Sequence, residues 1–188
     1  YLATAWESGA QPVVVVTKAA VRRQYAGEVE RFTDVVPTVL EGEDVRPLGA
    51  ADRFVILSYE ILPAWIKELE RWGRDSRPSV VFDEIHKVQS HKRWDATVEK
   101  PPDAEGDSNV IVLADEKPKV RFSLKDNIAA AAMRLTRIAS RRLGGTATPM
   151  RDRVRNLWAQ LDLVHPYGWG NYWTWAKRYC GAFERTFG

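Results

Sequence analysis

The stretch QPVVVVT, residues 11–17, is a continuous apolar run dominated by β-branched valines. Such a run is typical of a strand that is buried on both faces of a sheet. Two similar runs follow, RFVILSY (53–59) and PSVVFDE (78–84). Amphipathic segments of helical period separate them, at 18–32 and 60–72. Buried strands that alternate with amphipathic helices predict an α/β fold, a three-layer, mostly parallel sheet with helices on both faces.

The remaining segments extend this pattern with one interruption. Residues 95–126 combine a polar, acidic, Pro- and Gly-containing loop with two short apolar runs around EKPK, which predicts an insert ending in a β-hairpin. We further expect a helix at 1–8, short strands at 35–40 and from 141, and three C-terminal helices. Their apolar sides are predicted to be core, and they carry Ile128, Ala132, Leu135 and Ile138; Val154, Leu157, Trp158, Leu161 and Val164; and Trp169, Tyr172, Trp173, Ala176, Tyr179, Cys180 and Phe183.

Length and composition limit the possibilities. A chain of 188 residues with 45% hydrophobic and 28% charged residues is enough for one well-filled domain, which we place at 1–188. No uncharged apolar window is long enough to span a membrane, and the single Cys180 excludes an internal disulfide. We therefore expect a cytoplasmic location, or the nucleoid or nucleus where DNA is found.

Residues 141–188 carry eight Lys or Arg against three acids, so this quarter is a candidate surface for a polyanion, or simply a solvated helical face.

The stretch VVFDEIHKVQSHK (80–92) places two carboxylates, Asp83 and Glu84, at the end of a buried run. Asp83 could orient the water ligands of Mg²⁺, and Glu84 could polarise a water that attacks a phosphate. The pair could equally be the acidic start of a surface helix. A zinc site built from Glu84, His86 and His91 is disfavoured, because the spacing is not HExxH and no cysteine cluster is near.

Five blocks of the sequence, in order, resemble motifs of Snf-type superfamily-two helicases and translocases. They are PVVVVTKAAVRRQYAGEVERF (12–32), RFVILSYEIL (53–62), the DEAH-type box VVFDEIHKVQS (80–90), RRLGGTATPMRDRVRNLWAQLDLVHP (141–166) and YWTWAKRYC (172–180). The resemblance implies a RecA-like lobe that uses ATP and Mg²⁺ and binds DNA. The five blocks are similar to those in proteins of chromatin remodellers and in phage and bacterial members of the group.

The resemblance implies roles for individual residues. Asp83 would serve Mg²⁺ through water, Glu84 would be the catalytic base or position the attacking water, and His86 would couple the nucleotide site to the loop of Thr146 and Thr148. The residues that would contact the phosphates of DNA are Thr17, Lys18, Ser58, Tyr59 and Arg151. Ordinary strand capping remains the alternative for Thr17 and Ser58, and a solvated charged face remains the alternative for Lys18 and the arginine-rich segment 151–155.

The sequence also departs from the family pattern. Ile85 stands where a small residue is usual, Ala147 stands where glycine is common, and Arg151–Asp152 replace a usual Gln-Asn pair. No G-x-x-x-x-G-K-[ST] phosphate loop occurs, so we expect the chain to start just after that loop and to lack the second RecA-like lobe, which would leave the isolated fragment inactive.

The leading hypothesis is an ATP-dependent motor that couples hydrolysis to movement on double-stranded DNA. A restriction-type DNA translocase subunit or an unwinding helicase is the alternative within motors. A non-catalytic nucleic-acid-binding α/β module, with a vestigial acidic pair, is the alternative from another class.

Overall fold

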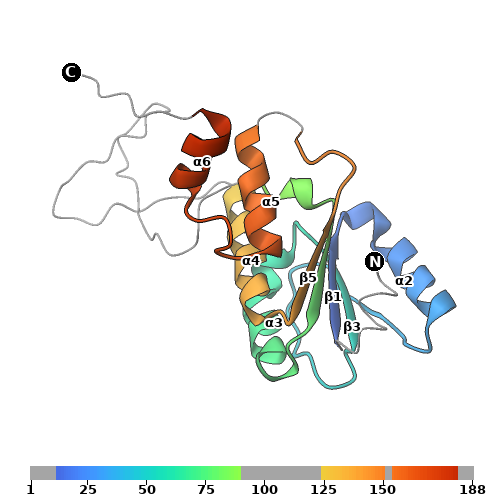
Figure 1. Ribbon diagram of the computed structural model, residues 1–188. Coiled ribbons are helices and arrows are strands. Elements are labelled where there is room, and N and C mark those ends of the chain that lie inside the picture. Colours follow the sequence, from blue (N-terminus) through green and yellow to red (C-terminus); the bar gives the residue numbers. More distant parts are fainter. Residues whose placement is uncertain (1–11, 90–123, 151–153, 182–188) are drawn as a thin grey trace, which may run out of the picture.

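The structure is a computed structural model, and it describes residues 12–89, 124–150 and 154–181 (Figure 1). Five strands form one sheet: β1 Val13–Thr17, β2 Thr38–Val39, β3 Phe54–Ser58, β4 Ser79–Asp83 and β5 Arg141–Gly145. The helices are α2 Arg22–Phe32, α3 Leu62–Ser76, α4 Leu124–Ile138, α5 Leu157–Val164 and α6 Tyr172–Cys180. Three short 3-10 turns are η1 Ala19–Val21, η2 Ile85–Lys87 and η3 Val154–Asn156.

The sheet is parallel throughout, with the strand order β2-β3-β1-β4-β5. In the register of β1, Val16 lies beside Leu57 of β3 and beside Phe82 of β4. The three central strands are buried along almost their whole length, which is why their sequences are continuous apolar runs rather than alternating ones. The predicted three-layer α/β fold is confirmed.

Successive residues of the central strands point to opposite faces of the sheet and form two cores. On one face, Val14, Val16 and Phe82 join the larger core with α3, α4, α5 and α6. On the other face, Val13, Val15 and Val81 join a smaller core that Val29 of α2 covers. Figure 1 shows this arrangement, with α2 on one side of the sheet and the other helices on the opposite side.

Helix α3 begins with Pro63 in its first turn, where the missing N–H costs nothing, and it ends at Arg77 in the left-handed conformation. It packs against α4, and Arg134 of α4 forms a forked ion pair with Glu70 of α3. Trp65 is buried beneath this layer, and its indole N–H donates to the carbonyl of Gly42 at 3.0 Å. These contacts fix the helical layer against the strands that carry the candidate site.

Several element boundaries differ from the sequence predictions. The segment predicted as a helix from 18 begins as the turn η1, and Phe32 at its end is 71% exposed. The strand predicted at 35–40 shortens to β2, because Pro37 removes a ladder donor and Val36 is exposed. Helix α4 begins at Leu124, inside the range predicted for the insert, so 124–126 belong to the helix. The rest of the predicted hairpin and the helix predicted at 1–8 lie outside the described residues.

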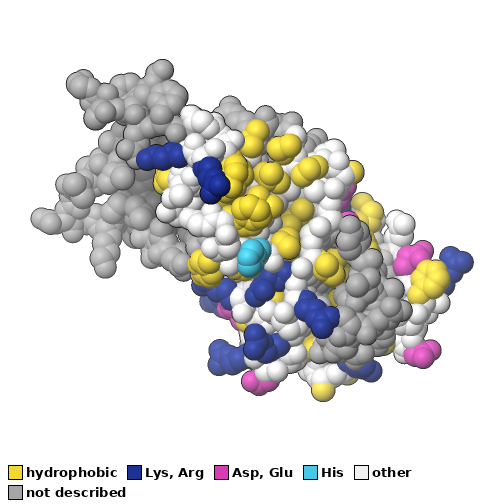
Figure 2. Space-filling model, viewed as in Figure 1, with side chains coloured by type: hydrophobic (Ala, Val, Ile, Leu, Met, Phe, Trp, Pro, Cys, Tyr) yellow, Lys and Arg dark blue, Asp and Glu magenta, His cyan; other side chains and the backbone are white. Residues whose placement is uncertain are grey.

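The aromatic side predicted to be core in the last helix is buried only in part. Trp175 and Ala176 of α6 enter the larger core, but Trp173 and Tyr179 are 62% and 49% exposed. In the same region Val154 and Val164, at the two ends of the predicted stripe, are also exposed. The physical reason in α6 is that this nine-residue helix meets the core mainly through the turn that carries Trp175 and Ala176. Figure 2 shows hydrophobic side chains gathered on the surface over this part of the molecule.

Candidate functional site at the strand ends

The carboxyl ends of β1 and β4 bring two predicted site residues together. The strands are parallel neighbours with Val16 beside Phe82, so Thr17 and Asp83 end the two strands at the same level. The hydroxyl of Thr17, which is completely buried, donates to Oδ2 of Asp83 at 2.8 Å. Because the side chains of parallel strands alternate together, this contact lies on the α2 face of the sheet.

The chain leaves β1 and β4 toward opposite faces of the sheet. The segment after β1 leads to α2, whereas the helix that precedes β5, α4, packs on the opposite face. In open α/β sheets such a divergence opens a crevice beyond the strand ends, and ligands bind there. Asp83 ends β4 and Glu84 directly follows it, so both lie at this position.

Two tyrosines surround Asp83. The hydroxyl of Tyr59, a residue with no exposed surface, donates to the backbone carbonyl of Asp83 at 2.8 Å. Burial and the negative charges of Asp83 and Glu84 raise the pKa of this phenol far above its ordinary value. Burial, followed by the charge and hydrogen bonding of Asp83, raises the pKa of Tyr25 to about 12. Both phenols therefore remain protonated donors at neutral pH.

Glu84 has an unusual backbone and a carboxylate with three polar neighbours. It lies in the left-handed region, with φ 53° and ψ 48°, which is uncommon for any residue other than glycine. The ammonium of Lys18 lies 3.0 Å from Oε1. Oε2 accepts from the hydroxyl of Thr146 at 3.2 Å and lies 3.0 Å from Nδ1 of His86. The hydrogen bond from Lys18 is the largest influence, and with those of the other neighbours it lowers the pKa of Glu84 despite partial burial.

His86 and Thr146 link the end of β4 to the loop after β5. His86 is buried, and its Nδ1 lies 2.9 Å from the hydroxyl oxygen of Thr146. The backbone N–H of Thr148 donates to the same oxygen at 3.1 Å. A proton on Nδ1 satisfies every contact, because Thr146 then accepts from His86 and Thr148 and donates to Glu84. The loop of β5 is thus tied to Glu84 through a single hydroxyl.

Comparison with known proteins finds similarity to two proteins of the same name. DNA annealing helicase and endonuclease ZRANB3 of Mus musculus is 27% identical over 139 residues, which cover 66% of this chain and 13% of that protein. The protein of the same name from Homo sapiens is 21% identical over 183 residues, which cover 94% of this chain and 14% of that protein. The chain thus spans about one seventh of the length of these relatives. No protein-family model matches it. The similarity and the all-parallel sheet fit a RecA-like fold.

The residues predicted to contact DNA have different surroundings in the structure. Thr17, Ser58 and Tyr59 are buried, and the hydroxyls of Thr17 and Tyr59 already donate to Asp83. At most 1% of each of these three residues is exposed in this structure, and their contacts with DNA stay predictions. Lys18 is partly exposed, but its ammonium faces Glu84. Arg151 lies outside the described residues.

The described residues give no support to the alternative of a zinc site. His91 lies outside the described residues, and among those that the structure describes no group of three metal-ligating side chains comes together. No helix in the described part of the chain is both long enough and apolar enough to cross a membrane.

Two features of the site were missed from the sequence. Tyr25 lies in the segment 18–32, for which the sequence predicts only an amphipathic helix, and its approach to Asp83 depends on the packing of α2 against this face of the sheet. The contact between Lys18 and Glu84 joins residues 66 positions apart, and no local pattern pairs them. The available signal was that each directly follows the end of a buried strand.

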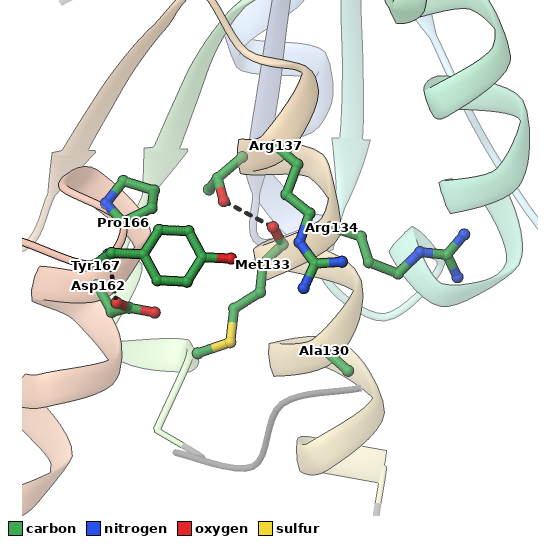
Figure 3. A pocket seen from close by; sticks show the side chains of 8 residues that line it. Ala130, Met133, Arg134, Arg137, Asp162, Pro166 and Tyr167 are labelled. Carbon is green, nitrogen blue, oxygen red and sulfur yellow. Dashed lines mark hydrogen bonds between the residues drawn. The ribbon is translucent and has the colours of Figure 1, made fainter. Parts of the chain in front are cut away.

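A separate hollow lies among the helices. It is formed between α4 and the turn after α5 and is lined by Met133, Arg134, Arg137, Asp162, Pro166 and Tyr167 among others (Figure 3). The close-up shows the guanidinium of Arg134 directed away from the others, toward α3, where it pairs with Glu70. Asp162 accepts from the backbone N–H of Tyr167 at 3.1 Å. None of the strand-end residues lines this hollow, so it is not the candidate site.

Proposed function

We propose that this chain forms part of the first lobe of an ATP-dependent motor that moves on double-stranded DNA. The observation that carries the proposal is the adjacent pair Asp83 and Glu84, held at the carboxyl end of β4 in the crevice where the chain diverges. Similarity to two DNA annealing helicase and endonuclease proteins supports a motor that acts on DNA. The resemblance of the sequence blocks to Snf-type translocases narrows the proposal to movement on duplex DNA.

In this proposal Asp83 holds Mg²⁺ through water. Carboxylate oxygens suit Mg²⁺, which usually keeps several of its own waters. The hydroxyl of Thr17 orients the carboxylate, and the hydroxyl of Tyr59 fixes the backbone of the same residue. When bound with ATP, Mg²⁺ would neutralise charge on the phosphate oxygens. The carboxylate of Asp83 therefore fits this ion in donor type.

Glu84 is proposed to position and polarise the attacking water. The pKa of Glu84 is lowered, so its carboxylate is ionised at neutral pH and can accept a hydrogen bond from water. Thr146 and His86 restrain the orientation of the carboxylate from the side of β5. The 188 residues contain no G-x-x-x-x-G-K-[ST] loop, so the proposal requires such a loop and a second lobe in the protein that carries this chain.

The decisive experiment is Glu84→Gln in the natural-length protein. The change preserves size but removes the charge, and loss of general-base assistance costs about 10²–10⁴-fold in rate, or roughly 3–5 kcal/mol of barrier. Single-turnover ATP hydrolysis with saturating DNA measures the rate, and a nucleotide titration should show retained binding. Glu28→Gln, at an exposed position in α2, is the matched control and should hydrolyse ATP at the wild-type rate.

The same experiment distinguishes the motor from a non-catalytic nucleic-acid-binding module. Such a module would bind DNA but would show no DNA-stimulated hydrolysis in the wild type. Wild-type turnover in Glu84→Gln would instead retire the catalytic assignment of this residue. Binding through phosphates should also weaken steeply with salt, with a log–log slope of about −0.9 per contact, and should tolerate changes of DNA sequence.

A further inference from the structure

The contact between Lys18 and Glu84 joins the two chain segments that leave the centre of the sheet. Lys18 directly follows β1 and Glu84 directly follows β4, and Nζ lies 3.0 Å from Oε1. The two side chains are 41% and 28% exposed, so the pair is partly open to solvent. A ligand that arrives from solvent can therefore reach the ammonium.

The ion pair with Lys18 limits the hydrogen bonds that the Glu84 carboxylate can accept from water. Its Oε2 already accepts from Thr146 and faces His86, so Oε1 is the oxygen left to accept from a water. The ammonium of Lys18 occupies that oxygen with a charge-assisted hydrogen bond. A carboxylate held in this way has less capacity to orient a water, because each of its oxygens already accepts a hydrogen bond.

Among the neighbours of the Glu84 carboxylate, the Lys18 ammonium is the group that a competing anion can draw away. Among the described residues it is the only lysine or arginine within 4.0 Å of the Glu84 carboxylate. A lysine ammonium is a point charge on a flexible stem, and it can turn toward another anion without loss of geometry. Ion pairs that are this exposed contribute little net free energy, so a nearby phosphate can compete with the carboxylate.

We propose that Lys18 is a DNA-responsive restraint on Glu84: a backbone phosphate of bound DNA draws the ammonium away and leaves Oε1 free to hold the attacking water. This inference rests on the proposed function, and it gives that function a route by which DNA stimulates hydrolysis. Lys18 acts here as a positioning residue, not as a catalytic one. The release of condensed cations from DNA on forming the phosphate contact favours the exchange.

The test compares Lys18→Met with the wild type in the natural-length protein, by steady-state ATP hydrolysis with and without duplex DNA. The DNA-free kcat should rise about 1.5- to fivefold, the factor that corresponds to the ~0.2–1 kcal/mol of a partly exposed pair, while KM for ATP stays the same. Stimulation by DNA should fall by a similar factor. Lys18→Arg should restore both, because the positive charge returns.

Two controls separate the restraint from other effects. Lys87→Met removes the lysine that directly follows His86 and lies 4.0 Å from Glu60, and it should leave the DNA-free rate unchanged. Lys18→Met in a Glu84→Gln background should add nothing, since the restrained carboxylate is gone. Lys18→Gln repeats the test with a polar replacement, and melting temperatures identify any variant that fails to fold.

Each other outcome overturns the inference in a recognisable way. An unchanged DNA-free rate with weaker DNA binding means that Lys18 is a DNA contact alone. A lower DNA-free rate means that Lys18 supports Glu84 rather than restrains it. If the wild type shows no DNA-stimulated hydrolysis, the proposed function fails and the inference fails with it. If DNA does stimulate hydrolysis by the wild type, either of the two results above refutes the inference only.

Discussion

The hydrogen bond between Thr17 and Asp83 makes a sharp prediction about what holds the site together. Thr17→Val keeps the β-branched shape and burial of the side chain but removes the hydroxyl that donates to Oδ2 at 2.8 Å. Hydrogen bonds to charged groups contribute about 1.5–3 kcal/mol. The carboxylate of Asp83 is partly exposed and can recruit water, so we expect the lower part of that range, roughly 1.5–2 kcal/mol.

A double-mutant cycle isolates this interaction from the gain of burying an extra methyl group. The variants are Thr17→Val, Asp83→Ala and the combination, and the free energy of unfolding of this domain is measured by urea titration. The coupling free energy should be about 1–2 kcal/mol in favour of the pair. For a domain of this size, the single change Thr17→Val should lower the melting temperature by roughly 3–8 °C. A coupling free energy below about 0.3 kcal/mol would show that the hydroxyl does not hold the carboxylate.

Three further predictions concern the fold around the site. Asp52→Asn should lower the free energy of unfolding by about 2 kcal/mol at pH 7. Burial raises the pKa of Asp52, but the hydrogen bonds from Arg46, Gly49 and Thr38 lower it overall, so the stability difference from the wild type should be complete above about pH 4 and shrink as pH falls through the folded pKa. A stability difference that persists at lower pH would contradict this. Trp65→Ala should destabilise by about 3–5 kcal/mol in urea titrations, and a cost under 1 kcal/mol would mean that the core relaxes around the gap. Glu70→Gln should cost at most about 1 kcal/mol, because its pair with Arg134 is partly exposed, and the difference should diminish in high salt; a salt-independent loss would point to packing instead.

The central strands could be predicted from the sequence because burial on both faces leaves a local signal. A run such as 13–17 has no polar alternation, and few other structures tolerate four successive valines. The margins carried weaker signals. Trp173 has helical spacing, yet it is exposed, because periodicity indicates which residues share a side of a helix but not whether another element covers that side.

The candidate site could be predicted in part, and the missing part depends on strand order. Strands β1 and β4 are neighbours in space although β2 and β3 separate them along the chain. That adjacency brings Thr17 to Asp83 and Lys18 to Glu84, and it cannot be read from either segment alone. A lysine after a strand can reach a phosphate or a carboxylate with the same chemistry, so sequence reasoning could name Lys18 as charged and near the site without naming its partner.

The backbone of Glu84 connects these observations. A glutamate at φ 53° costs of order 1 kcal/mol or more relative to a relaxed conformation, and such strain persists only where surrounding contacts impose it. Here the contacts come from three directions: Tyr59 holds the preceding carbonyl, and Lys18 and Thr146 hold opposite carboxylate oxygens. The left-handed turn directs the carboxylate away from the path of β4 and toward the segments that follow β1 and β5. An extended or helical residue at this position would send the side chain elsewhere. The same strain that costs stability therefore places one carboxylate within reach of both the Lys18 ammonium and the loop of β5, which is the arrangement that a DNA-responsive restraint requires.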